Sequence, residues 1–344
     1  MRRRALLLGI CTLLACLACG ASAEPPVPPA VITISAAGDV TIGADTRKRT
    51  NLFAAELARQ EGDLGFPFRN VQAIFSQDDL TLVNLECALT NRPSATRNTF
   101  SFAGKPEHVQ ALVLGSVEAV ALDNNHVFDH GVRGYADTQE TLREAGIVFS
   151  GNGEAGILEA RGVKIGMLSY RTFDGGYARI RKDMPGAIAA LRAQGCSLVI
   201  VSYHWGAERE YTPNQNQVTL GRETIDAGAD LVLGHHSHCI NPIERYKGKY
   251  ICYSLANFSF AGNSNPADKD TFIFQQRFLV TADGVQDAGI RIVPCRISSV
   301  TERNDFMPTP YEAEDAQRVA DKLVTLGEKL PYALRAYPLD WTKP

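Results

Sequence analysis

The sequence predicts an α/β fold in which mixed β-sheets carry helices on their outer faces. In the first two thirds of the chain, short apolar runs alternate with amphipathic segments, as strands and helices do in α/β proteins. Between residues 249 and 297, three apolar runs follow one another directly, which favours strands paired without helices between them. Five apolar runs end in Asp, Asn, Glu or His. Ligands collect at such strand ends in open sheets, so a functional site is expected there.

Composition and charge fit a soluble globular protein. The 344 residues are 45% hydrophobic and 21% charged, an ordinary balance for one large domain or two smaller ones. The net charge of −3 gives no electrostatic basis for binding nucleic acid, so no nucleic-acid partner is expected. We predict one domain over residues 31–300 and a C-terminal extension over 301–344 that carries a charged amphipathic helix at 311–330.

The N-terminus predicts export. Arg2-Arg3-Arg4, an apolar run to about Cys19 and then Ala21-Ser22-Ala23 match a signal peptide at 1–23, which is cleaved after Ala23. A stiff, proline-rich linker follows at 24–30. The protein is then periplasmic or extracellular. Leu13-Leu14-Ala15-Cys16 loosely resembles a lipobox, which leaves a membrane-anchored lipoprotein as the alternative.

The first half of the chain reads as strands alternating with helices. Leu52, Phe53 and Leu57 share one face of a helix, Pro106 suits a first helical residue, and Gly146 suits a helix end. We expect helices over 50–62, 71–75, 106–115 and 134–145, and strands over 31–37, 80–83, 100–102, 117–122, 147–150 and 163–170.

The second half begins with a segment that contains several glycines, 171–186. We expect it to be a loop that precedes a short helix at 187–194. Further strands are expected over 196–203, 231–233, 249–255, 271–281 and 289–297, and a helix over 214–228.

The clearest strand end follows the apolar run Val117–Leu122. Asp123, Asn124, Asn125, His126, Asp129 and His130 come directly after it, and a buried strand cannot absorb so many polar groups without partners. Any one such cluster is more often a turn or a salt bridge than a site. Their recurrence favours a site, and the other strand ends contribute Asp39, Asn84, Glu86, His204, Glu208, His235, His236 and His238.

These residue types suit a borderline-hard divalent cation, namely Zn, Mn or Fe. A pair of such ions can clamp a phosphoryl group and activate water. His236 and His238 are two residues apart, so in an extended segment they point the same way and can bind one centre, with His235 turned away. A register that uses His235 and His238 is the alternative.

Five cysteines lie beyond the signal segment, and an odd number cannot all pair within one chain. Most lie in or beside apolar runs, where a small buried thiol is expected, although a bridge between Cys239 and Cys252 is an alternative. The five are Cys87, Cys196, Cys239, Cys252 and Cys295.

The motifs at the strand ends resemble those of the bacterial capsule-synthesis (CapA-type) family, which includes poly-γ-glutamate synthesis proteins. They occur in the family's order from Ala37 to Phe258. The matching segments are Ala37–Val40, Asn84–Thr90, Asn124–Gly131, Tyr203–Glu208, Gly234–His238, Glu244–Tyr250 and Tyr253–Phe258.

The resemblance implies a calcineurin-like metallophosphoesterase fold, a four-layer sandwich of two mixed β-sheets flanked by helices. It implies an envelope location and one or two divalent metal ions. The implied metal ligands are Asp39, Glu86, Asn125, His204, His236 and His238. His126 and Asp129 take the role of catalytic acid or phosphate contact, and Asn84, His235, Glu208 and Asn257 are the implied substrate contacts.

Some positions depart from the metallophosphoesterase pattern. Thr41 stands where the first motif usually has His, and Asn84-Leu85-Glu86 replaces the usual Gly-Asp of the second. Ser237 and Ala256 replace a frequent Pro and Gly. One of the two metal positions is therefore expected to be altered or absent.

The resemblance implies an exported protein that synthesises or processes an anionic envelope polymer, such as capsule or poly-γ-glutamate, through a metal-dependent hydrolytic site. Its substrate would be the anionic polymer or a phosphoester. One alternative is a non-catalytic accessory or binding subunit that works with membrane-bound synthesis or export subunits. Another is a secreted phosphodiesterase.

Overall fold

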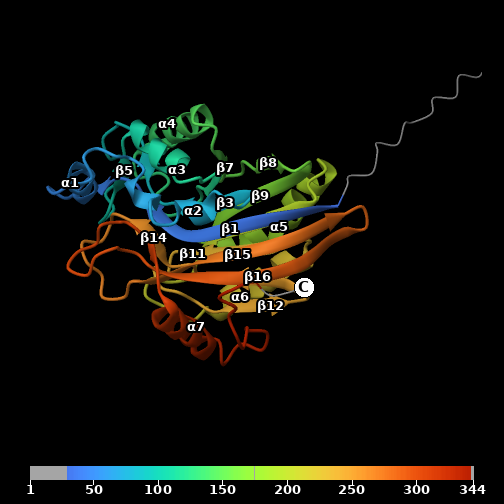
Figure 1. Cartoon of the computed structure of the whole chain (residues 1–344). Coiled ribbons are helices and arrows are strands. Elements are labelled where there is room, and N and C mark those ends of the chain that lie inside the picture. Colours follow the sequence, from blue (N-terminus) through green and yellow to red (C-terminus); the bar gives the residue numbers. More distant parts are fainter. Residues whose placement is uncertain (1–28, 174, 342–344) are drawn as a thin grey trace, which may run out of the picture.

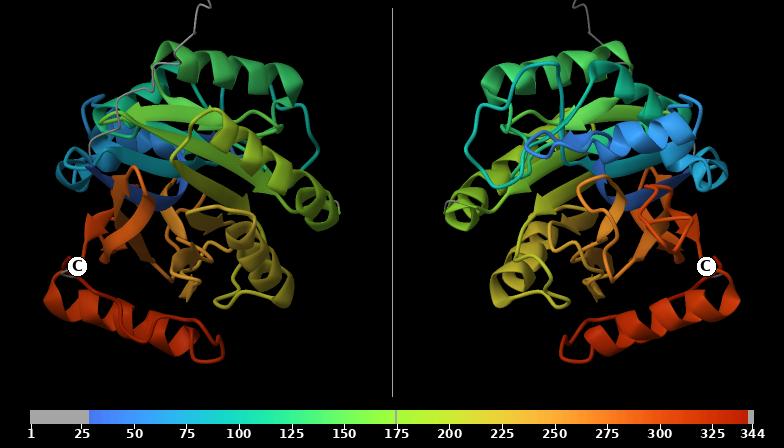
Figure 2. Two further views of the ribbon diagram at one scale, coloured as in Figure 1. Left: turned by 90° about the vertical axis from the view of Figure 1, so that its right-hand side faces the viewer. Right: turned by 90° about the vertical axis from the view of Figure 1, so that its left-hand side faces the viewer.

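The computed structural model describes residues 29–173 and 175–341. Two large β-sheets pack face to face and carry helices on their outer faces (Figures 1 and 2). The predicted α/β sandwich of two mixed sheets is therefore confirmed. The predicted signal peptide, 1–23, and residues 24–28 of the predicted linker lie outside the described residues.

The first sheet has eight strands in the order β17-β16-β15-β1-β3-β6-β7, and β14 also pairs with β1. Strands β14, β1, β3, β6 and β7 run parallel, whereas β15, β16 and β17 join by antiparallel pairing. The strands are β1 (Ala30–Thr41), β3 (Leu80–Leu85), β6 (Ala119–Ala121), β7 (Val148–Ser150), β14 (Asn257–Phe260), β15 (Asp270–Thr281), β16 (Gly284–Arg296) and β17 (Thr309–Pro310).

The second sheet has six strands in the order β12-β13-β11-β10-β9-β8, with β13, β11, β10 and β9 parallel. These strands are β8 (Gly156–Ala160), β9 (Val163–Arg171), β10 (Leu198–His204), β11 (Leu231–His235), β12 (Ile243–Tyr246) and β13 (Lys249–Cys252). A small third sheet joins β2 (Ala44–Asp45), β5 (Phe102–Gly104) and β4 (Ala88–Leu89).

Three hydrophobic clusters hold the layers together. Residues such as Ile34 of the first sheet and Ile200 of the second fill the space between the sheets. A second cluster joins the first sheet to α1–α4, and a third joins the second sheet to α5 and α6. The helices are α1 (Leu52–Arg59), α2 (Gln72–Phe75), α3 (Gln110–Leu114), α4 (Gly131–Glu144), α5 (Gly176–Ala193), α6 (Gln215–Asp226) and α7 (Ala313–Leu326), with 3₁₀ turns at Phe66–Phe68 and Pro106–Val109.

The expected loop over 171–186 is wrong, because α5 already begins at Gly176 and runs through Pro185. Its buried residues Ile180, Met184 and Ile188 recur every four positions and pack on the second sheet. This apolar stripe outweighs the cost of a proline in a helix, which by itself favours a break.

Two strands differ from the expected ranges in ways that affect the site. Strand β1 extends to Thr41 and so contains Asp39, whereas the sequence placed Asp39 after the strand. Strand β14 begins at Asn257, directly after Ala256 in a left-handed conformation (φ 63°). A strand that starts after such a turn carries no periodicity signal long enough to detect.

The five cysteines of the described part are buried and unpaired. This agrees with the expectation of small buried thiols, and it excludes the alternative bridge between Cys239 and Cys252. The helices in the described ranges include none with the length and apolar character needed to cross a membrane.

Helix α7 closes one side of the space between the sheets, opposite α4 (Figure 2). It contributes Val319 and Leu323 to the inter-sheet cluster. Its polar side is held by Asp270, which accepts hydrogen bonds from Arg318 Nη1 at 2.9 Å, Arg318 Nη2 at 2.8 Å and Lys322 Nζ at 2.9 Å.

We expect Asp270→Asn to lower the free energy of unfolding by about 1–2 kcal/mol at neutral pH, allowing for the exposure of Arg318. Burial alone would raise the pKa of Asp270, but Arg318 and Lys322 hold it at about 2. A depressed carboxyl pKa stabilises the fold above the unfolded value of 3.8, and this stabilisation is lost as the pH falls toward the folded value. Urea unfolding of the wild type and the variant at several pH values measures the difference in their free energies of unfolding. If this difference does not become smaller at acid pH, the role given to the Asp270 carboxylate is wrong.

Candidate metal centre

The strand ends of both sheets meet at one edge of the sandwich. Asp39 lies in register with Asn84 of β3 and with Asn257 of β14. In the second sheet, His204 pairs with His235. Because parallel strands end at the same edge, the polar residues that follow them converge there.

One potential ligand group consists of Asp39, Glu86 and His204, whose ligand atoms all lie within 4.8 Å of one another. All three side chains are buried. His204 Nε2 lies 3.6 Å from Glu86 Oε1 and 2.8 Å from Asn125 Oδ1. Asn125 therefore lies beside this group, as the sequence predicts.

A second group consists of Glu86, His236 and His238, again within 4.8 Å of one another. Glu86 belongs to both groups. His236 Nδ1 lies 3.0 Å from His204 Nε2, and His238 Nδ1 lies 3.3 Å from Asp39 Oδ2. The structure thus brings all six predicted metal ligands together in one place.

The donors in this place fit a divalent metal ion. Glu86 Oε1 is buried and accepts no hydrogen bond, although an unpaired buried carboxylate oxygen is costly. The ring nitrogens of His204 and His236 face each other, and each ring belongs to a ligand group that contains the Glu86 carboxylate. A set of imidazole nitrogens and carboxylate oxygens suits Mn, Zn or Fe.

Burial and neighbouring charges shift the pKa values of the predicted ligands when no metal is bound. Burial would raise the pKa of Asp39, but hydrogen bonds to His235 and His238 hold it well below its usual range. Burial and the charge of Asp39 raise the pKa of Glu86 well above its usual value. Burial, followed by the charge of His238, lowers the pKa of His236 to about 4.

His238 behaves in the opposite way. Burial would lower its pKa, but its hydrogen bond to Asp39 and the charge of Glu86 raise the value to about 9. At neutral pH the metal-free site therefore keeps a proton on His238. His238 must release this proton before it can bind a cation.

We therefore expect the affinity for Mn²⁺ to increase with pH below the His238 pKa, by about tenfold per pH unit for each proton released. Calorimetric titration in two buffers with different heats of ionisation counts these protons. A binding heat that does not depend on the buffer would contradict the protonation states given above.

The histidine-rich segment differs from the extended geometry that the sequence suggested. Strand β11 ends at His235, and His236 and His238 both have left-handed backbones, with φ of 96° and 56°. Such angles are rare for residues with a Cβ atom and typically occur at functional sites. His235 does not turn away either, because its Nδ1 lies 3.4 Å from Asp39 Oδ1.

His126 and Asp129 form a hydrogen-bonded pair beside the metal ligands. His126 Nδ1 lies 2.6 Å from Asp129 Oδ2, and His126 Nε2 lies 3.9 Å from Glu86 Oε1. Asp129 is buried and also accepts hydrogen bonds from the Phe102 amide at 2.9 Å and from Asn98 Nδ2 at 3.3 Å. Asp129 therefore fixes the ring of His126, while Nε2 faces the ligands.

Two cavities open beside His238. The smaller, of about 130 Å³, is lined by His126, Glu208 and the rings of Phe100, Phe102 and Phe260. The larger, of about 380 Å³, is lined by residues that include Asn257 and Tyr211. Of the predicted substrate contacts, Glu208 and Asn257 thus reach cavity space.

The other two predicted substrate contacts lie behind the ligands. Asn84 is buried and donates from Nδ2 to Asp39 Oδ1 at 2.8 Å and to Glu86 Oε2 at 3.4 Å. His235 is 1% exposed, and its contact is with Asp39. In the structure these two side chains are placed to orient ligands rather than to touch a substrate.

Three further residues complete the site. Thr41, which stands in place of the usual histidine, donates its hydroxyl to the backbone carbonyl of Glu86 at 3.1 Å. Asn124 Nδ2 donates to the Leu85 carbonyl at 2.8 Å, and its Oδ1 accepts from the His126 amide at 3.0 Å. Arg209 lines both cavities. In the sequence, only its position next to Glu208 indicated that Arg209 could belong to the site.

The two packed sheets, with imidazoles and carboxylates gathered at their strand ends, define a protein of metallophosphoesterase-like fold. Residues 33–261 match the family described as bacterial capsule synthesis protein PGA_cap. The chain belongs to this family, which confirms the resemblance seen in its motifs.

Three relatives illustrate the similarity. The PGA biosynthesis protein CapA of Bacillus subtilis is 29% identical over 255 residues, which cover 67% of this chain and 63% of the relative. The capsule biosynthesis protein CapA of Bacillus anthracis is 28% identical over 255 residues, 67% of this chain and 60% of the relative. A probable polyglutamine synthesis accessory protein of Mycobacterium tuberculosis is 32% identical over 210 residues, 52% of this chain and 55% of the relative. The matches thus span less than two thirds of each relative.

Proposed function

We propose that this protein acts in the synthesis or processing of an anionic envelope polymer, capsule or poly-γ-glutamate, as a metal-dependent hydrolase. The observation that carries the proposal is the pair of ligand groups that share Glu86, beside the His126–Asp129 pair. The names of the Bacillus relatives support the polymer.

The proposed hydrolysis assigns the site residues to three roles: metal binding, proton donation and orientation of the ligands. Asp39, Glu86, Asn125, His204, His236 and His238 would hold one or two ions of Mn, Zn or Fe, which supply Lewis acidity and activate water. His126 gives a proton from Nε2 to the leaving group, and Asp129 holds its ring by the bond to Nδ1. Asn84 orients Asp39 and Glu86 by its two hydrogen bonds.

We further propose that the protein works outside the cytoplasm, in the periplasm or at the cell surface. The support is the basic, apolar and small-residue pattern at the start of the sequence. An envelope polymer is assembled by membrane-bound machinery, so subunits for its synthesis or export are the expected partners.

The test is a hydrolysis assay on the purified mature protein loaded with Mn²⁺ or Zn²⁺. γ-Linked polyglutamate and a chromogenic phosphodiester are offered in parallel. We expect chain cleavage that stops with a chelator and in Glu86→Gln, which keeps the size of the side chain. No turnover of either substrate by the loaded protein overturns the hydrolase, and turnover of the phosphodiester alone favours a secreted phosphodiesterase.

One observation favours a second candidate, a non-catalytic accessory subunit. Thr41 cannot take over the role of the usual histidine, because its hydroxyl is committed to the Glu86 carbonyl. Complementation separates the two candidates. In cells that lack the native protein, His126→Ala restores polymer formation if the role is accessory and fails to restore it if the role is hydrolytic.

A further inference from the structure

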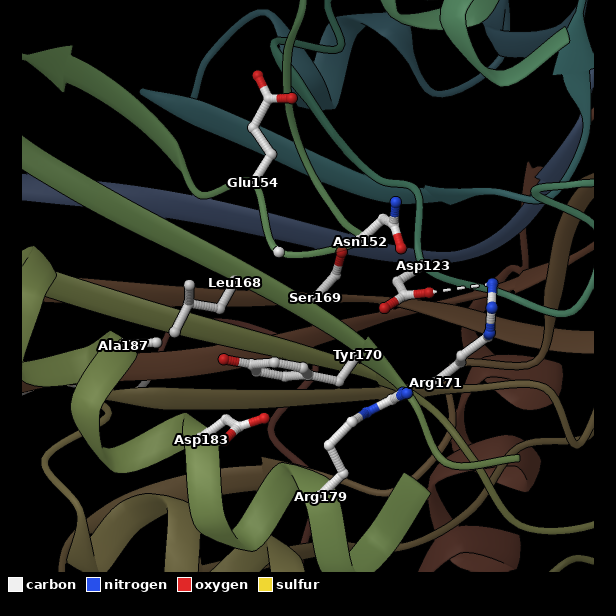
Figure 3. Close-up of a pocket in the computed structure, with 11 residues that line it drawn as sticks. Asp123, Asn152, Glu154, Leu168, Ser169, Tyr170, Arg171, Arg179, Asp183 and Ala187 are labelled. Carbon is white, nitrogen blue, oxygen red and sulfur yellow. Dashed lines mark ion pairs between the residues drawn. The ribbon is translucent and has the colours of Figure 1, made fainter. Parts of the chain in front are cut away.

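A separate cavity of about 400 Å³ opens between β9, α5 and the turn that follows β7. Figure 3 shows side chains from all three segments directed into it. The side chains of Leu168 and Ala187 form an apolar part of the cavity lining, and the ring of Tyr170 forms an aromatic part. The volume is in the range of small-molecule sites.

Part of the charge around this cavity is already neutralised within the protein. Arg171 Nη1 lies 3.4 Å from Asp123 Oδ1. Glu154 accepts hydrogen bonds from Gln139 Nε2 at 2.8 Å and from Arg143 Nη2 at 2.9 Å. Neither Asp123 nor Glu154 is therefore left to attract a ligand.

Two opposite charges remain. Arg179 and Asp183 lie four residues apart on α5 and both line the cavity, yet neither side chain makes an ion pair or hydrogen bond within the described ranges. Figure 3 shows Arg179 reaching toward the end of β9, while Asp183 points toward the ring of Tyr170. Among the described residues Arg171 donates hydrogen bonds only from Nη1, and its guanidinium group lies over the ring of Phe128, 5.2 Å from the centroid. Its remaining N–H groups are available.

This arrangement selects an amphoteric ligand. The guanidinium groups of Arg171 and Arg179 can hold carboxylate groups, since arginine binds carboxylates through paired N–H donors. The carboxylate of Asp183 can hold an ammonium group, and the face of Tyr170 can cover the carbon chain of the ligand. A simple anion would leave Asp183 unpaired, and a simple cation would leave Arg179 unpaired.

We propose that this cavity binds an amino dicarboxylic acid of the glutamate class, with its carboxylates at Arg171 and Arg179 and its ammonium at Asp183. The ligand is either the free amino acid or the amino-terminal unit of a γ-linked chain, which keeps its ammonium and α-carboxylate groups and offers the γ-carboxyl as an amide carbonyl that an arginine can also hydrogen-bond. The assignment of this chemistry rests partly on the proposed polymer function, and the charges that recognise the ligand are independent of it.

The cavity is connected to the metal centre through Arg171 and the loop after it. Arg171 Nη1 donates to the Asn124 carbonyl at 3.4 Å, directly before the predicted ligand Asn125. Phe173 packs edge-on against the His236 ring, with centroids 4.8 Å apart. Arg171, which lines the cavity, thus lies two residues before a side chain that packs on a predicted metal ligand.

Isothermal titration of the mature protein with D-glutamate, L-glutamate and glutarate tests the site. We expect saturable binding of a glutamate enantiomer, weakened about tenfold or more in Arg179→Gln. Glutarate lacks the ammonium group, so Asp183→Asn should weaken glutamate and leave glutarate unchanged. Lys182→Gln, on the same helix but outside the cavity lining, is the matched control and should bind normally.

Two results would overturn the proposal. One is no binding of either enantiomer to the wild type. The other is binding that survives in Arg179→Gln and is lost in His238→Ala, since the ligand would then sit at the metal centre. Hydrolysis that persists while glutamate fails to bind rejects this cavity and leaves the proposed function intact. Titration with γ-linked diglutamate distinguishes the two possible ligands. If diglutamate binds as tightly as glutamate, the ligand is a chain end, and if glutamate alone binds, the ligand is the free amino acid.

Discussion

Replacement of His126 by alanine should lower the rate of hydrolysis by about 10²- to 10⁴-fold, the usual contribution of a positioned general acid. Its Nδ1 is held by Asp129, while its Nε2 lies 3.9 Å from Glu86 Oε1 and faces the smaller cavity. His126 belongs to neither ligand group. The metal content of the variant should therefore match that of the wild type.

Asp129→Asn distinguishes the effect of the Asp129 charge on proton transfer by His126 from the role of Asp129 in positioning the His126 ring. The variant keeps a side chain that can contact His126 Nδ1, but it loses the charge that stabilises a protonated ring. We expect a smaller loss of kcat than for His126→Ala and a shift of the pH–rate profile with little change in KM. If His126→Ala hydrolyses polymer at the wild-type rate, another group supplies the proton.

The second large effect is expected for Gly38→Ala. A Cβ atom at Gly38 would lie 1.9 Å from the Ala256 carbonyl oxygen and 2.8 Å from that of Leu255. The backbone must shift, and this breaks the hydrogen bond from the Asp39 amide to the same Ala256 oxygen, now 2.8 Å. We expect a loss of about 3 kcal/mol or more in the free energy of unfolding, together with loss of bound metal.

Gly186→Ala is the matched control for this substitution. Gly186 lies in α5, and nothing comes within 4 Å of the Cβ position. Alanine is the better helix former, so the variant should be more stable by about 0.5–1 kcal/mol. If urea unfolding shows Gly38→Ala to be as stable as the wild type, the close approach of β1 to Ala256 does not require glycine at position 38.

Most of the candidate site could be predicted because strand ends leave a mark in the sequence. A buried apolar run that stops at Asp123 or His204 places a polar group at a known edge of a sheet. Parallel strands bring such edges together without any need to know the long-range contacts. For this reason the six predicted ligands of the metal converge in the structure.

Other features could not be predicted, because they depend on packing between distant segments. The glycines of residues 171–186 suggested a loop, while the burial of Ile180 and Met184 against the second sheet makes the segment a helix. The left-handed backbone of His236 follows from its surroundings and not from its residue type. That Arg179 and Asp183 line one cavity becomes evident only when α5 is seen to lie beside β9.

The central claim is that these strand ends form a metal centre, and elemental analysis of the purified protein tests it most directly. Wild type is compared with Asp39→Ala and His238→Ala, and circular dichroism confirms that each variant is folded. We expect about one or two equivalents of Mn, Zn or Fe in the wild type and a loss of metal in both variants. Wild-type protein that holds no metal, even after reconstitution with Mn²⁺ or Zn²⁺, would contradict the claim and leave a binding role for the pocket.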